Sequence, residues 1–159
     1  MRKKYKYGII LPLKESFLKR SSGAVSIFVN EYLNNSKLKS DTIIFTNKLK
    51  GQYLSKNVNE IDNQNIFFSN LNYIKKICKT NTFRNLDHVE IHNRPLYAEY
   101  IKKNYPKKKI SLFLHNSFYS KNSTLNNKKK NYLLYNCDSI VFVSYFLKKQ
   151  FFNSLDVND

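Results

Sequence analysis

Polar residues that could do chemistry follow three short apolar runs in the second half of the chain. They are His92, Asn93 and Arg94 after Val89–Ile91, His115 and Asn116 after Ile110–Leu114, and Ser144 after Ile140–Val143. Imidazole, amide, guanidinium and hydroxyl groups bind polar or anionic ligands, and an imidazole also moves protons near neutral pH. His115 is the strongest candidate for a catalytic residue, although a histidine after an apolar strand is often only structural.

A polar or helical segment follows each of these apolar runs, which is typical of parallel strands joined by crossover helices. In such a sheet the ligand crevice lies outside the carboxyl ends of the strands. We therefore expect the polar residues to meet at one edge of the sheet and to form the functional site there.

The first half of the chain continues the same alternation. Its predicted strands are Tyr7–Leu11, Thr42–Thr46 and Ile66–Phe68, with a polar loop from Lys48 to Gln64. The 3.6-residue period predicts a helix from Ala24, then helices around Leu71–Cys78, Pro95–Ile101, Leu125–Tyr135 and Phe146–Phe151. The sequence thus predicts an α/β fold over residues 1–159: one Rossmann-like domain with a doubly wound, mostly parallel sheet of about six strands and helices on both faces.

The first predicted helix has a second candidate site at its start. Ser22 is a plausible N-cap, and Gly23 leaves the backbone open to close approach. Free N–H groups and the helix dipole could hold an anion there. An ordinary capped helix explains the same residues equally well.

The balance of charge favours an anionic partner. The chain has 28 Lys+Arg against 11 Asp+Glu, a formal net charge of +17. Nucleic acid, anionic lipid and phosphorylated substrates all fit this charge, as does a bias toward Lys, Asn and Ile with no binding role. There is no apolar run near twenty residues, so we expect no membrane span. Cys78 and Cys137 predict buried thiols in a reducing compartment, and we expect a cytoplasmic protein.

Several kinds of active site are disfavoured by the sequence. His88 and His92 flank a predicted strand, so they form no helical metal pair, and we expect no metal and no cofactor. There is no serine in a nucleophile elbow and no Walker loop. What remains is the set of polar groups at the strand ends.

Four segments in series resemble one enzyme family. SSGAVSIFVNEYL, VEIHNRP, ISLFLHN and CDSIVFVSYFLKKQFF are similar to the N-terminal domain of family-4 glycosyltransferases with the GT-B fold, of the kind that builds bacterial lipopolysaccharide and other surface polysaccharides. The resemblance covers nearly the whole chain in the same order and spacing. It implies retaining transfer of a sugar from a nucleotide-sugar donor to a saccharide or lipid-linked acceptor, without a metal.

The resemblance also implies roles for individual residues. Ser22 and Gly23 match the loop that approaches the donor diphosphate, and His115 matches the histidine beside the transferred sugar. Asn93, Arg94 and Asn116 match the acceptor side. Two departures stand out: Ala24 replaces a second glycine that the family often has, and the family's C-terminal domain, with its paired nucleotide-binding glutamates, has no counterpart in these 159 residues.

Alternatives therefore stay open. The chain is a fragment, one half of a split enzyme with a separate C-terminal half, or a remnant. A basic module that binds nucleic acid, or a peripheral membrane module without activity, is the alternative function. Nucleic acid is disfavoured because the lysines are scattered and the aromatics fall on predicted buried faces. We also expect an apolar strip where a second domain would dock, and attraction to the anionic inner face of the plasma membrane.

Overall fold

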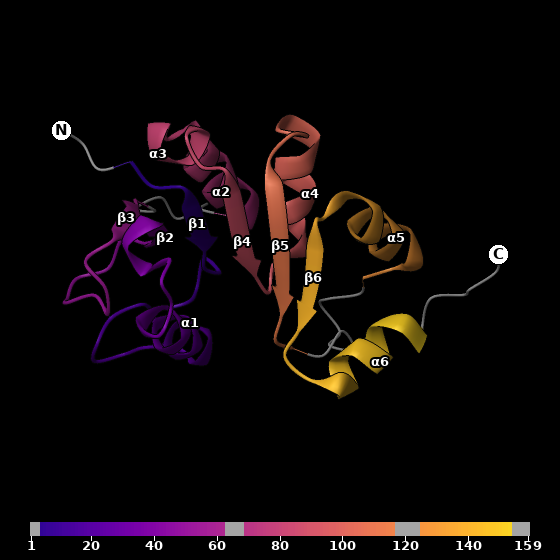
Figure 1. The fold of residues 1–159 in the computed structure, drawn as a ribbon, viewed down its shortest axis with the longest axis horizontal. Helices are drawn as coiled ribbons and strands as arrows, with labels where there is room; N and C mark the ends of the chain where they lie inside the picture. Colours follow the sequence, from indigo (N-terminus) through magenta and orange to yellow (C-terminus); the bar gives the residue numbers. More distant parts are fainter. Residues whose placement is uncertain (1–3, 63–68, 117–124, 154–159) are drawn as a thin grey trace.

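The computed structural model describes residues 4–62, 69–116 and 125–153, and the chain in these ranges forms a three-layer α/β domain (Figure 1). The strands are β1 (Tyr7–Ile10), β2 (Thr42–Asn47), β3 (Val58–Ile61), β4 (His88–His92), β5 (Lys109–Leu114) and β6 (Ser139–Phe142). The helices are α1 (Ala24–Asn34), α2 (Asn70–Lys79), α3 (Asn81–Arg84), α4 (Pro95–Asn104), α5 (Asn127–Asn136) and α6 (Tyr145–Asn153), with a short 3₁₀ turn, η1 (Lys39–Asp41).

The six strands form one sheet in the order β3-β2-β1-β4-β5-β6, and every neighbouring pair in it is parallel. This is the strand order of a doubly wound dinucleotide-binding fold. The predicted fold class is therefore confirmed. The order reverses between β1 and β4, because the chain leaves β1 toward β2 and leaves β4 toward β5 on the other side.

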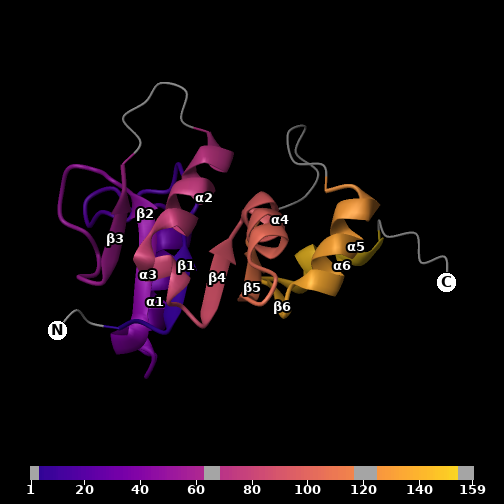
Figure 2. The ribbon, with the colours of Figure 1, turned by 90° about the horizontal axis from the view of Figure 1, so that it is seen from above.

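Helices cover both faces of the sheet, but unequally. On one face, α1 packs through Val25, Val29 and Leu33 against Ile9 and Ile44. The other face is covered by α2 to α6, and Figure 2 shows α2, α4 and α5 along that side. Parallel sheets need such double cover because every strand residue points to one of two buried faces.

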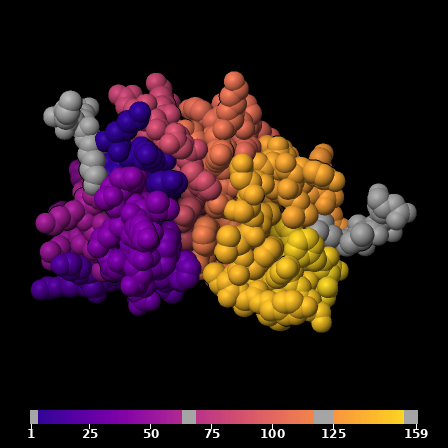
Figure 3. Space-filling view, viewed as in Figure 1, coloured from indigo at the N-terminus to yellow at the C-terminus, as the bar shows by residue number. Residues whose placement is uncertain are grey.

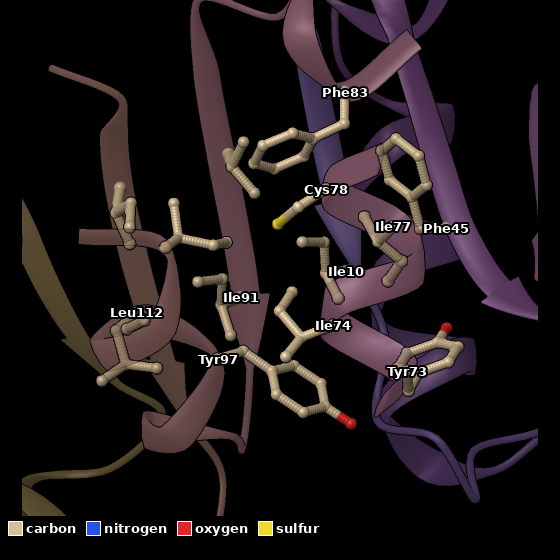
Figure 4. Close-up of a cluster of buried hydrophobic side chains, with 14 of the residues drawn as sticks. Ile10, Phe45, Tyr73, Ile74, Ile77, Cys78, Phe83, Ile91, Tyr97 and Leu112 are labelled. Carbon is tan, nitrogen blue, oxygen red and sulfur yellow. The ribbon is translucent and has the colours of Figure 1, made fainter. Parts of the chain in front are cut away.

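The larger core lies between the sheet and α2 to α6 (Figure 4). Each helix contributes a fully or nearly fully buried apolar side chain: Ile74, Phe83, Tyr97, Leu133 and Phe151. Burial of such a side chain is worth about 2 kcal/mol each. The Tyr97 hydroxyl donates to Asn70 Oδ1 at 2.7 Å and accepts from the backbone N–H of Leu13 at 3.3 Å. It thereby ties the loop after β1 to α2 and α4.

The structure corrects the predicted loop between β2 and α2. Val58–Ile61, placed by the sequence in a polar loop, forms the edge strand β3. Its pattern is weak because Asn59 and Glu60 interrupt the apolar residues, and only backbone pairing with β2 reveals it. The predicted strand Ile66–Phe68 lies outside the described residues.

Smaller corrections concern helix ends and faces. The first helix is capped by Gly23 and not by Ser22, and the short helix α3 was not predicted. Leu96 and Phe146, predicted to face the sheet, are exposed, whereas their neighbours Tyr97 and Leu147 in the same helix turns are buried. Both cysteines are free thiols, as predicted; burial raises the pKa of Cys78 to about 12 and that of Cys137 to about 11.

In the described ranges no helix has the length and apolar character needed to cross a bilayer.

Candidate functional site

The candidate site lies at the carboxyl edge of the sheet, next to the point where the strand order reverses. We call this region the crevice, and define it by the loop 11–23 after β1, by His92, Asn93 and Arg94 at the end of β4, and by His115 and Asn116 after β5. The strands end toward the bottom of Figure 1, between α1 and the start of α6. The space-filling view is indented along the same lower edge, between the violet atoms of α1 and the gold C-terminal elements (Figure 3).

Two histidines meet at this edge. His92 ends β4 and is fully buried, and His115 follows β5 and is half-buried. The register pairs His92 with Phe113, so His115 lies on the same face two residues further on. His92 Nδ1 and His115 Nε2 are 2.9 Å apart and form a hydrogen bond. Burial, together with the neighbouring His92, lowers the pKa of His115 to about 4.

Asn93 fixes the ends of β4 and β5 relative to each other. Its backbone is in the left-handed region, with φ of 54°, which asparagine tolerates better than most residues. Its N–H donates to Phe113 O at 2.8 Å, and its Oδ1 accepts from the His115 N–H at 2.7 Å. The side chain therefore holds the His115 backbone, and α4 has no side-chain hydrogen bond at its N-cap.

Arg94 and Asn116, the other two residues predicted on the acceptor side, differ in burial and in hydrogen bonding. Arg94 is the N-cap residue of α4, and its Nη1 donates to the Asn93 carbonyl at 2.8 Å. Its Nε is buried without a hydrogen-bond partner among the described residues. Asn116 is exposed. Ser144 lies at the same edge, but its Oγ accepts from the Leu147 N–H at 3.3 Å and so begins α6.

Three residues that sequence reasoning missed stand behind and beside the histidines. The Phe28 ring meets the His115 ring edge-on, with centroids 5.1 Å apart. The Tyr32 hydroxyl donates to Glu90 Oε2, and this same oxygen lies 3.8 Å from His92 Nε2. The only signal for Glu90 was a lone acidic residue inside an apolar strand. Phe28 and Tyr32 looked like ordinary residues of a buried helix face.

The Ser22-Gly23 loop is engaged by the protein's own carboxylate. Glu15 Oε1 accepts from the backbone N–H of Ser26 at 2.9 Å and caps α1. The Ser22 hydroxyl donates to the Leu18 carbonyl at 2.5 Å. An anion at this helix N-terminus would have to displace Glu15. The structure thus brings His92, Asn93, Arg94 and His115 together. Among the described residues, no hydrogen bond joins Ser22 or Gly23 to this group; α1 reaches it through Phe28, one helical turn after Gly23.

A substitution at Gly23 tests this cap. A Cβ at position 23 would stand 2.6 Å from Glu15 Cδ, so Gly23→Ala should displace the carboxylate and its cap. The loss of a cap costs about 1 kcal/mol. With Glu15→Ala already present there is no carboxylate to displace, so the same change should cost less. Urea unfolding of the two single variants and the double variant measures this difference, and additive effects would contradict the cap.

The described side chains that contact His115 suit a ligand rich in hydroxyls. They include His92, Asn93 and Phe28. An imidazole and an amide exchange hydrogen bonds with hydroxyls, and an aromatic ring packs against their apolar C–H surface. Across the described ranges, no cluster of three or more histidine, cysteine or acidic residues is arranged to hold a metal.

Comparison with protein-family models, with curated proteins and with solved structures found no match for this chain. The function must therefore be argued from the crevice itself and from the sequence resemblance.

His88 provides an internal control for experiments on this site. It begins β4, at the opposite end of the strand from His92, and its Nε2 lies 2.8 Å from Ser111 Oγ. The chain has three histidines, and His88 is the one that does not belong to the His92–His115 pair.

Proposed function

We propose that the chain is the acceptor-binding half of a retaining, nucleotide-sugar-dependent glycosyltransferase that builds a cell-envelope polysaccharide at the cytoplasmic face of the membrane. In this proposal a donor-binding domain outside these residues completes the site. The single observation that carries the proposal is His115, a neutral imidazole beside the Phe28 ring, one strand away from the switch point of the sheet. The resemblance to family-4 glycosyltransferases supplies the reaction.

The surface around the crevice supports a two-domain arrangement. Exposed apolar side chains stand in the first turns of α1, α4 and α6 and just after β6, where each helix begins at the carboxyl edge. They are Ile27, Phe28, Leu96, Val143, Tyr145 and Phe146. Exposed apolar side chains at one edge are typical of a surface that another protein part covers.

Some of the basic residues are explained without a nucleic acid. Lys76 and Lys79 lie in the last turn of α2, and Lys102 and Lys103 in the last turn of α4. These helices run back from the carboxyl edge, so their last turns lie at the opposite end of the sheet. Basic groups there are stabilised by the helix dipole, and they need no nucleic acid to explain them.

Saccharide binding tests the proposal directly. We expect the fluorescently labelled chain to bind a subset of an array of bacterial-envelope saccharides. His115→Ala should weaken that binding at least tenfold, about 1.4 kcal/mol, while the matched His88→Ala variant should bind like the wild type. Circular dichroism checks that both variants fold. If no saccharide is retained at millimolar concentration, or if His115→Ala binds as well as the wild type, the proposal is wrong.

We also expect association with anionic bilayers, because the proposed acceptor is saccharide or lipid-linked and the net charge is +17. A lysine near an anionic surface contributes about 1 kcal/mol, and salt screens this attraction. Co-sedimentation with phosphatidylglycerol vesicles should therefore be strong at low salt and weak at high salt. Equal retention on neutral phosphatidylcholine vesicles would contradict an electrostatic mode.

A further inference from the structure

A line of polar side chains runs behind His115 on the face of the sheet that α1 covers. The Tyr32 hydroxyl of α1 donates to Glu90 Oε2 in β4. Glu90 Oε2 lies 3.8 Å from His92 Nε2, and His92 Nδ1 lies 2.9 Å from His115 Nε2. The line leads from a half-buried carboxylate to the partly exposed histidine in the crevice.

The carboxylate decides which nitrogen of His92 carries the proton. His92 is fully buried, and its Nε2 has no hydrogen-bond partner among the described residues. Glu90 is a charged group near this nitrogen, and a lone pair on Nε2 would face its negative oxygen across 3.8 Å. A proton on Nε2 turns this repulsion into attraction, which is strong where water is excluded. The neutral His92 is therefore protonated on Nε2.

The proton on His92 in turn decides the state of His115. With Nε2 protonated, Nδ1 of a neutral His92 can only accept a hydrogen bond. The partner at 2.9 Å, His115 Nε2, must then be the donor. A neutral His115 that carries its proton on Nε2 has a free lone pair on Nδ1. Among the described residues none donates to that nitrogen, and the side chain is only half-buried.

We propose that Glu90 is a positioning residue that acts through His92 and makes His115 Nδ1 a hydrogen-bond acceptor for a hydroxyl group of the ligand in the crevice. That the ligand is a saccharide rests on the proposed function. Which ring nitrogens of His92 and His115 carry protons does not. Asn93 assists by holding the His115 backbone through Oδ1 at 2.7 Å. Tyr32 supports the carboxylate by donating a hydrogen bond to Oε2.

Glu90→Gln should reverse the polarity of the line. A glutamine amide can donate to His92 Nε2, so the proton of His92 moves to Nδ1 and is donated to His115 Nε2. His115 then carries its own proton on Nδ1 and presents a donor in place of an acceptor. The side chain keeps its size, so a role in packing alone would leave the histidines unchanged.

Long-range proton–nitrogen NMR of the ¹⁵N-labelled chain at pH 7.5 reads the two nitrogens of each ring. With three histidines in the chain, the His88→Ala and His115→Ala spectra assign all signals. The wild type should show His92 and His115 both protonated on Nε2. Glu90→Gln should show both protonated on Nδ1, with His88 unchanged. Tyr32→Phe, which keeps the carboxylate, should retain the wild-type pattern.

A wild-type His115 protonated on Nδ1, a doubly protonated His92 at this pH, or a Glu90→Gln spectrum like the wild type would each overturn the inference. The first two outcomes do not depend on Glu90→Gln, so they count even if that variant fails to fold. Saccharide binding adds a separate readout, and Glu90→Gln should weaken it about tenfold. If the protons lie as expected but no saccharide binds, the proposed function fails and the positioning role stands. If saccharide binds but the protons lie otherwise, the positioning role fails alone.

Discussion

Purified by itself, the 159-residue chain should transfer no sugar from a nucleotide sugar at an ordinary enzymatic rate. Transfer requires the donor to be fixed against the acceptor. In the family that the sequence resembles, a second domain grips the nucleotide. The crevice has His115 and the strand ends, which we assign to the acceptor. The N-terminus of α1, which could hold the donor diphosphate, is already occupied by the Glu15 carboxylate.

The size of the expected loss follows from the value of orientation. Well-oriented reactants save roughly 7–11 kcal/mol of the barrier, and each tenfold in rate corresponds to about 1.4 kcal/mol. Losing half of the orientation therefore costs about three orders of magnitude. Water that enters an unclosed crevice weakens the polar contacts further.

The test is incubation of the chain with labelled UDP- and GDP-sugars and a lipid extract of the source organism. A complete two-domain enzyme of the same reaction class, run with its own substrates, shows that the assay detects transfer. A rate of roughly one per second or more from the chain alone would contradict the prediction. It would mean that a dimer, or a further site in this chain, supplies the donor half.

His115 should make the protein lose stability in mild acid. Its pKa falls from the ordinary 6.5 to about 4 on folding, because burial and the neighbouring His92 disfavour the charged ring. Above pH 6.5 the ring is neutral in both states, and this contribution to stability is fully present. Between 6.5 and about 4 the unfolded chain binds a proton that the folded chain does not. Stability is therefore lost as the pH falls through this window.

The free energy of unfolding in urea, measured from pH 7 to 4.5, checks this expectation. His115→Gln removes the titrating group, so its stability should fall much less over this range than that of the wild type. The matched variant His88→Gln should keep the wild-type slope. A His115→Gln protein with the same pH dependence as the wild type would show that His115 is not held neutral by the fold.

The fold could be predicted because buried parallel strands are nearly continuous apolar runs. Ile110–Leu114 and Thr42–Thr46 were found within one residue of β5 and β2. Val58–Ile61 was missed because an edge strand is half-exposed, and the backbone bonds to β2 that stabilise it leave little mark on the side-chain pattern.

The sequence by itself determined that polar residues follow the strands and that parallel topology gathers them at one edge. That is enough to place His92, Asn93, Arg94 and His115 near one another. Only the tertiary structure decided how they are used. The strand register faces His92 toward His115, and the packing of α1 brings Phe28 and Tyr32, far away in the chain, against the same face. Hydrogen bonds act over about 3 Å and depend on direction, so no spacing in a linear pattern could have shown that Glu90 stands behind the histidines.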